Sequence, residues 1–275
     1  MSDKKLKVTI LTHGGAERFL EILSAVDEVE IVGVFVETST IKERPFVEKV
    51  KRSIRYDGYF ATVKKLASKF LPSGNAVPDD AQAIEKGQNS LAECAGKLDL
   101  PLTKVIDYHS DEAITLLKAA NADLGILYGT NIVRESVFGV PKLGSINIHQ
   151  GLAPLYRGGP TVFWELLNGE KEVGITVHFV AAKVDTGDIV LQKTVPLDYD
   201  FSIYGLRYEE FLDDFRASVK EPSAQLLAEA VRQIASGKEK RTKQDTTIGK
   251  RYRLPVKTEK DQLLSILKKR HEGGR

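Results

Sequence analysis

The first 36 residues alternate between strand-like and helix-like patterns, and this alternation restricts the fold more than any other feature of the chain. Lys7–Thr12 is a short apolar run of strand length, and Glu30–Val36 is a second one. Between them, Ala16–Val26 carries Phe19 and two leucines at helical spacing. A strand–helix–strand unit closes by a right-handed crossover, which makes its strands parallel. We therefore predict an α/β protein with a Rossmann-like, mostly parallel twisted sheet flanked by helices.

The same alternation continues in the middle of the chain. Lys104–Tyr108 and Ala122–Tyr128 have the pattern of strands, separated by a helix over Asp111–Ala120. Two β-rich runs, Gly174–Val180 and Ile189–Val195, predict a hairpin-like pair of strands. These elements extend the sheet and assign residues 1–200 to one main domain.

Residues 40–100 interrupt this domain with a different pattern. Lys42–Gly58 is charged and predicts a loop, whereas Tyr59–Leu71 has helical periodicity. Asp79–Leu98 predicts another helix, because Asp79 and Asp80 would place acidic groups in its first turn. We expect this stretch to form a helical insertion.

The last part of the chain, residues 201–275, predicts a small, mainly helical and basic extension. Helical patterns cover Phe201–Val219, Pro222–Ile234 and Thr258–Lys269, with an extended strip over Gly249–Pro255. From residue 235 onward, 13 lysines and arginines oppose 5 acidic residues, a net charge of +8 that leaves −6 for residues 1–234. A basic run can contact phosphates, but it is more commonly a solvated face. We therefore do not expect a nucleic-acid partner.

The composition is that of a globular protein from a reducing compartment. The chain is 42% hydrophobic and 28% charged, and Cys94 is its only cysteine, so no intrachain disulfide can form. The first apolar run is too short for a signal peptide, and no stretch approaches the length of a membrane span. The sequence has no Cys/His cluster at metal-ligand spacing. We expect a cytoplasmic protein without a bound metal or a membrane contact.

Three polar residues carry the pattern of a catalytic site. Ser145–His149 alternates apolar and polar residues, so Asn147 and His149 share one face at the carboxyl end of a predicted strand. Asp185 follows in the segment Lys183–Asp188. The amide can donate to an oxyanion, the imidazole can move a proton, and the carboxylate can set its protonation. This combination is suited to acyl transfer.

The residues around this trio add a family resemblance. They include Pro154, Tyr156-Arg157-Gly158, Pro160, Trp164, Asn168-Gly169, Gly174–Val180, Asp185–Ile189, Gln192 and Pro196. This run resembles the catalytic core of the folate-dependent formyltransferases, which include glycinamide ribonucleotide formyltransferase, methionyl-tRNA formyltransferase, the sugar N-formyltransferases and formyltetrahydrofolate hydrolases. The resemblance is close over residues 123–198 and looser over residues 6–122. It implies that residues 1–200 are the catalytic domain, with Asn147, His149 and Asp185 as catalytic residues.

The resemblance also implies a co-substrate and residues that bind it. The formyl donor would be N10-formyltetrahydrofolate, with no metal and no covalent enzyme intermediate. Its pterin would contact Gly129, Ile132 and Val133 in the loop after a strand, and Val184 and Gly187 beside Asp185. For the other substrate, we expect Gly14 and Gly15 to offer an anion-binding turn, together with Arg157 and Gly158.

Two further expectations concern histidines. We interpret His178, which lies outside the trio, as a structural residue that is held by hydrogen bonds. We also expect Asp185 to favour the imidazolium of His149 and to hold its pKa above the usual value of about 6.5.

The acceptor is the least determined part of the function. Arg157-Gly158-Gly159-Pro160 with Trp164 is similar to sugar formyltransferases, whereas Val177–Val180 is similar to the purine-pathway enzyme. Because Ala16-Glu17-Arg18 places an acidic residue at the first turn, we slightly favour the primary amine of an amino-sugar nucleotide. Glycinamide ribonucleotide is the first alternative, followed by methionyl-tRNA or hydrolysis of the folate. A non-catalytic folate-binding module and a homodimer also remain open.

Overall fold

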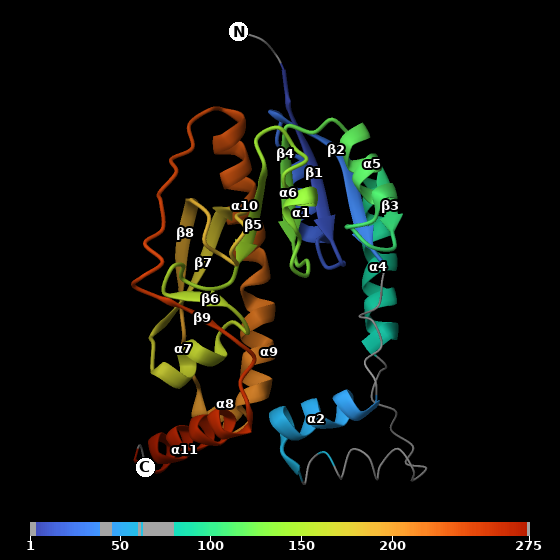
Figure 1. Ribbon diagram of the computed structural model, residues 1–275. Helices are drawn as coiled ribbons and strands as arrows, with labels where there is room; N and C mark the ends of the chain where they lie inside the picture. The colour runs from blue at the N-terminus through green and yellow to red at the C-terminus, as the bar shows by residue number, and fades with distance from the viewer. Residues whose placement is uncertain (1–3, 39–45, 60–61, 63–79, 274–275) are drawn as a thin grey trace.

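A seven-stranded sheet runs through the molecule (Figure 1). The structure, a computed structural model, describes residues 4–38, 46–59, 62 and 80–273. The strand order is β3-β2-β1-β4-β5-β7-β8, and the neighbours from β3 to β5 are parallel, whereas β7 is antiparallel to both β5 and β8. The strands are β1 Leu6–Thr12, β2 Val29–Glu37, β3 Leu102–Val105, β4 Leu124–Tyr128, β5 Ser145–His149, β7 Glu172–Phe179 and β8 Ile189–Pro196. The predicted Rossmann-like, mostly parallel sheet is confirmed.

A second, two-stranded sheet joins distant parts of the chain. β6, Tyr156–Gly158, pairs in parallel with β9, Lys250–Tyr252. The sequence predicted an extended strip at the position of β9 but did not indicate its partner strand. Through this pair, the basic C-terminal segment lies beside the loop that follows β5.

Helices cover the sheet and extend beyond one end of it (Figure 1). They are α1 Glu17–Ser24, α2 Phe46–Asp57, α4 Asp80–Lys97, α5 Asp111–Ala119, α6 Glu135–Phe138, α7 Phe163–Asn168, α8 Phe201–Tyr204, α9 Tyr208–Ser218, α10 Lys220–Ala235 and α11 Lys257–Gly273. The start of α5 shows why local sequence predicts such elements, because the Ser110 side chain accepts a hydrogen bond from the Ala113 amide and caps the helix. No helix in the described part of the chain is both long and apolar enough to cross a membrane.

One expectation about the insertion is wrong. Lys42–Gly58 was predicted as a loop, but the structure places α2 over most of it. Its apolar residues Val47, Val50 and Ile54 are three and four positions apart, a helical spacing that its many charges obscure. α2 contacts α11, where Asp57 lies 3.7 Å from the Lys260 amine. The helix predicted over Tyr59–Leu71 lies almost entirely outside the described residues.

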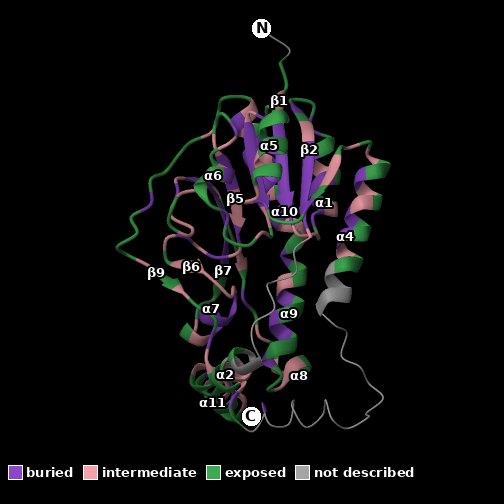
Figure 2. Cartoon of the chain, turned by 45° about the vertical axis from the view of Figure 1, so that its right-hand side comes forward, coloured by how far each residue is buried: buried purple, intermediate pink, exposed green. Residues whose placement is uncertain are grey.

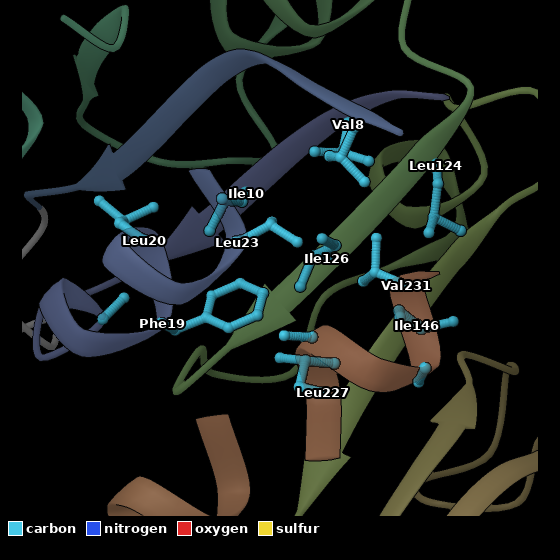
Figure 3. Close-up of a cluster of buried hydrophobic side chains, with 14 of the residues drawn as sticks. Val8, Ile10, Phe19, Leu20, Leu23, Leu124, Ile126, Ile146, Leu227 and Val231 are labelled. Carbon is cyan, nitrogen blue, oxygen red and sulfur yellow. The ribbon is translucent and has the colours of Figure 1, made fainter. Parts of the chain in front are cut away.

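The main core contains residues from both ends of the chain. Figure 3 shows side chains of β1, α1, β4 and β5 packed with Leu227 and Val231 of α10. Leu227 and Val231 are both fully buried. The helix α10, which lies in the predicted C-terminal extension, therefore completes the core of the parallel sheet.

A second core supports the other half of the molecule. It joins α7, β7, α9 and α11 through buried residues that include Phe163, Ile175, Phe211 and Leu263. Figure 2 shows the central strands buried and the outer faces of the helices exposed. These two cores hold β5 and its following loop between them, and this position is where the candidate site lies.

Candidate active site

The three residues predicted to be catalytic line one cavity. The cavity has a volume of about 660 Å³, and Asn147, His149 and Asp185 all contribute to its wall. β5 supplies Asn147 and His149 from one face of its carboxyl-terminal end. Asp185 comes from the loop between β7 and β8, where its φ of 52° lies in the left-handed region. The cavity therefore opens where the strand ends of the sheet meet this loop.

Asp185 is held from three sides. One of its carboxylate oxygens accepts a hydrogen bond from the Gly158 amide at 2.8 Å. The same oxygen lies 3.6 Å from Nδ1 of His149, and the other oxygen lies 3.4 Å from Nε2 of His178. Burial raises the pKa of Asp185, but His178, His149 and the Gly158 amide outweigh that effect and lower it to about 2. The carboxylate is therefore ionised at neutral pH.

The position of His149 overturns one expectation about its charge. Its side chain is buried, and its Nε2 lies 2.8 Å from the Tyr156 carbonyl oxygen. Because a carbonyl oxygen can only accept, Nε2 carries the proton of the neutral ring, and the Nδ1 lone pair faces Asp185. Burial lowers the pKa of His149 more than the attraction of Asp185 raises it, since the imidazolium loses its water. The expected upward shift of this pKa is wrong.

His178 is part of the same polar cluster. Its Nδ1 donates to the Phe179 carbonyl oxygen at 2.7 Å, so Nε2 is free to accept in the neutral ring. That Nε2 lies 3.4 Å from Nδ2 of Asn147 and 3.4 Å from Asp185. The interpretation of His178 as structural was therefore incomplete, because this ring also orients the Asn147 amide. Asn147 and His178 are partners across β5 and β7, a pairing that the sequence pattern alone does not reveal.

Most residues predicted to bind the folate lie along the cavity. Gly129, Ile132, Val133 and Val184 all line it. Gly187 is not among the described residues that line the wall, and its φ is not in the left-handed region. A side chain at Gly187 would collide with the Phe179 carbonyl oxygen. Close packing therefore explains why this position is glycine.

A half-buried histidine, His13, anchors the loop that contains Gly129. His13 follows β1, and its Nε2 lies 2.6 Å from the carboxylate of Glu37 at the end of β2. The other ring nitrogen, Nδ1, lies 3.1 Å from the Gly129 carbonyl oxygen. Both contacts are to acceptors, so His13 ties the ends of three neighbouring strands together. The sequence alone gives no indication of a role for His13 or Glu37.

The residues predicted to bind the second substrate are separated in the structure. Gly158 lines the cavity, whereas Gly14, Gly15 and Arg157 are not among the described residues of its wall. The Arg157 guanidinium instead donates to the carbonyl oxygens of Pro154, Thr246 and Gly249, at 3.2, 3.3 and 3.3 Å. Arg157 therefore holds the C-terminal segment in place.

The C-terminal segment contributes cavity residues that the sequence pattern did not indicate. Arg251, Tyr252, Arg253 and Leu254 all line the cavity. The sequence predicted an extended basic strip over Gly249–Pro255 but did not indicate its partner β6. Among the described residues, no group of three or more His, Cys, Asp or Glu side chains is placed to hold a metal ion.

Comparison with known proteins agrees with this fold. Residues 7–207 match the formyl transferase family. The chain belongs to the formyl transferase family.

Individual relatives show how far the likeness extends. A methionyl-tRNA formyltransferase from Azobacteroides pseudotrichonymphae is 31% identical over 55% of this chain and 44% of its own length. A second, from Roseiflexus sp. (strain RS-1), is 37% identical over 46% of this chain and 40% of its own length. The chain thus spans less than half the length of these curated relatives.

A solved structure shares the fold over a larger part of the chain. Glycinamide ribonucleotide transformylase 1 from Symbiobacterium toebii aligns with a TM-score of 0.55 at 21% identity, over 85% of this chain and 89% of that chain. At this identity, the likeness concerns the fold alone.

Proposed function

We propose that this chain transfers a formyl group from N10-formyltetrahydrofolate to the primary amine of a small acceptor. The observation that carries this proposal is the meeting of Asn147, His149 and Asp185 in one cavity. Family membership supports the same reaction. An amide donor, a neutral imidazole and an ionised carboxylate together are the groups that acyl transfer to an amine requires.

The cavity fits a folate. Its volume of about 660 Å³ lies within the usual range for small-molecule sites, roughly 300–1,000 Å³. Ile132, Val133 and Val184 give it apolar walls, and backbone groups from Gly129 onward are available for the polar edge of a pterin. When bound, the folate supplies the formyl carbon that the amine attacks.

The side chains divide the proton transfers between them. His149 presents its Nδ1 lone pair, because Nε2 donates to the Tyr156 carbonyl, and Nδ1 can therefore take a proton from the attacking amine. The nearby Asp185 carboxylate stabilises the imidazolium that results, and this imidazolium can return the proton to the departing folate nitrogen as the bond between that nitrogen and the formyl carbon breaks. The Asn147 amide donates to the oxygen of the formyl group as it gains negative charge, and losing such a donor typically costs about 100-fold to 1,000-fold in rate.

For the acceptor, we favour an amino-sugar nucleotide. The glycine-rich turn after β1 lies outside the cavity wall, which weakens glycinamide ribonucleotide as the acceptor, since its phosphate would need a cradle there. A solved 4-N formyltransferase from Francisella tularensis, with a TM-score of 0.54 at 19% identity over 90% of this chain and 76% of that chain, has the same fold.

Methionyl-tRNA is the second candidate. The curated relatives at 31% and 37% identity are methionyl-tRNA formyltransferases, and the C-terminal segment of this chain is basic. A basic segment would support RNA binding through phosphates, with an affinity that falls steeply as salt rises.

A direct assay separates these candidates. The purified chain is incubated with N10-formyltetrahydrofolate and either an amino-sugar nucleotide, glycinamide ribonucleotide, initiator methionyl-tRNA or no acceptor, and the folate product is followed by absorbance. We expect turnover with an amino-sugar nucleotide and a large loss of it in His149→Ala. Turnover that is equal without an acceptor would indicate hydrolysis, and turnover with none of them would contradict the proposal.

A further inference from the structure

One wall of the cavity comes from the C-terminal segment and is held firmly in place. Arg251 lies opposite Arg157 in the parallel pair of β9 and β6. Tyr252 stacks on Tyr156, with ring centres 5.1 Å apart and planes at 7°, and also contacts Trp164 at 5.0 Å. The Trp164 indole donates to the backbone carbonyl of the next residue along, Arg253, at 2.8 Å. This wall is therefore an ordered part of the site.

The two arginines of this wall differ in their partners. The Arg253 guanidinium forms two hydrogen bonds with the Glu259 carboxylate, at 2.8 and 2.9 Å, so its charge is compensated. The Arg251 side chain is exposed and lines the cavity, and it has no hydrogen bond or ion pair with any residue that the structure describes. Arg251 thus offers its full hydrogen-bonding capacity to a ligand.

Arg251 also lies close to the reacting groups. Its side-chain stem passes next to Gly158, because a Cβ built on Gly158 would lie 3.2 Å from Cγ of Arg251. The amide of that same Gly158 donates to the Asp185 carboxylate. A guanidinium in this position can reach a group on the same molecule as an amine that is bound beside Asp185 and His149.

We propose that Arg251 is the anion-binding residue of the acceptor subsite, and that the acceptor carries a phosphate group near its amine. This inference rests on the proposed function and specifies the acceptor further. A guanidinium binds phosphate through two parallel N–H donors, which a lysine cannot do. Arg157 does not line this cavity, and its Nε and Nη2 donate to backbone carbonyl oxygens that hold the C-terminal segment.

The folate also carries carboxylates, on its glutamate tail, and these are the other anions that Arg251 could meet. Of the residues proposed for the folate, Gly129, Ile132 and Val133 follow β4 and Val184 adjoins Asp185, whereas Arg251 lies on the pair of β6 and β9. This separation favours the acceptor as the source of the anion.

Binding of inorganic pyrophosphate to the full chain tests the inference without an acceptor. Calorimetry at low ionic strength gives the affinity, and the fluorescence of Trp164, the only tryptophan, reports on the wall itself. We expect Arg251→Gln to weaken pyrophosphate binding roughly tenfold to a hundredfold, with Arg251→Lys in between. Lys243→Gln removes the same charge from an exposed position of the segment that does not line the cavity, so it should bind as the wild type does.

Tetrahydrofolate affinity, measured on the same proteins, distinguishes the two anions. We expect it to be unchanged in Arg251→Gln. The inference would be overturned if the wild type did not bind pyrophosphate, or if Arg251→Gln bound it as tightly as the wild type does. It would also be overturned if Arg251→Gln lost affinity for tetrahydrofolate and not for pyrophosphate. If the wild type transfers formyl groups, the proposed function stands whatever the result of the pyrophosphate measurements. Conversely, Arg251-dependent pyrophosphate binding in a chain without transferase activity would support the anion site and contradict the proposed reaction.

Discussion

At the scale of single residues, the site depends on a buried imidazole beside an ionised carboxylate. Nδ1 of His149 lies 3.6 Å from Asp185, too far for a strong hydrogen bond, while Nε2 is engaged by the Tyr156 carbonyl. Burial therefore dominates, and it lowers the pKa of His149. A neutral His149 is suited to accept a proton, and the ion pair with Asp185 gains its full value only after the proton has moved.

This arrangement predicts the pH dependence of the reaction. As pH falls through the lowered pKa of His149, the ring is protonated and can no longer act as a base, so the rate should drop along an acidic limb below about pH 6.5. In Asp185→Asn the charge that raises this pKa is absent, so the limb should move to still lower pH. Rate profiles and NMR titration of the five histidines, assigned through His149→Ala, measure this shift. A limb that moves to higher pH in Asp185→Asn would contradict this prediction. The pKa values that the profiles yield belong to the coupled pair of His149 and Asp185 and not to either residue alone.

At the scale of elements, α7 contains an acidic residue in an unfavourable place. Glu165 is 2% exposed and lies in the apolar core that joins α7, β7, α9 and α11, next to Phe163, Trp164 and Leu166. Burial raises its pKa to about 7. Between about pH 4.5 and 7, the unfolded chain therefore releases this proton more readily than the folded one. Glu165 should make the protein less stable as pH rises through that range.

Glu165→Gln tests this effect, because glutamine has nearly the same shape and does not ionise. At pH 8 the variant should be more stable than the wild type by up to about 3 kcal/mol, since each pKa unit is worth about 1.4 kcal/mol. Near pH 4.5 the two should be equally stable. Urea unfolding at both pH values measures the difference. The same stability difference at both pH values would mean that packing, and not ionisation, accounts for it.

At the scale of the whole molecule, the segment after residue 200 is required to complete the core of the parallel sheet. α10 places Leu227 and Val231 against α1 and the strands β1, β4 and β5 (Figure 3). β9 closes the wall of the cavity through β6. The segment after residue 200 is thus integrated with the sheet through packing and pairing.

Leu227→Ala measures how strongly the stability of the sheet depends on the segment after residue 200. Leu227 is fully buried, so the truncation should cost about 2–5 kcal/mol and leave a single cooperative unfolding transition. Gln225→Ala, on the exposed face of the same helix, should change stability by less than about 0.5 kcal/mol. Two transitions, with only the weaker one affected by Leu227→Ala, would show that α10 belongs to a separately folding unit.

The sequence by itself determined the features that depend on local periodicity. The alternation of strands and helices predicted the parallel sheet, because apolar spacing decides which face of each element is buried. The period of two along Ser145–His149 likewise placed Asn147 and His149 on one face. The charged stretch that forms α2 is the exception, since its few apolar residues carry a weak signal.

Only the tertiary structure decided which distant residues meet and how much water surrounds them. The sequence favoured Arg157 as a ligand-binding arginine, but packing commits Arg157 to the C-terminal segment and leaves Arg251 facing the cavity. It also brings His178 against Asn147 and buries His149, which reverses the expected direction of its pKa. Both outcomes depend on strand pairing across long separations and on desolvation, neither of which has a local signature in the chain.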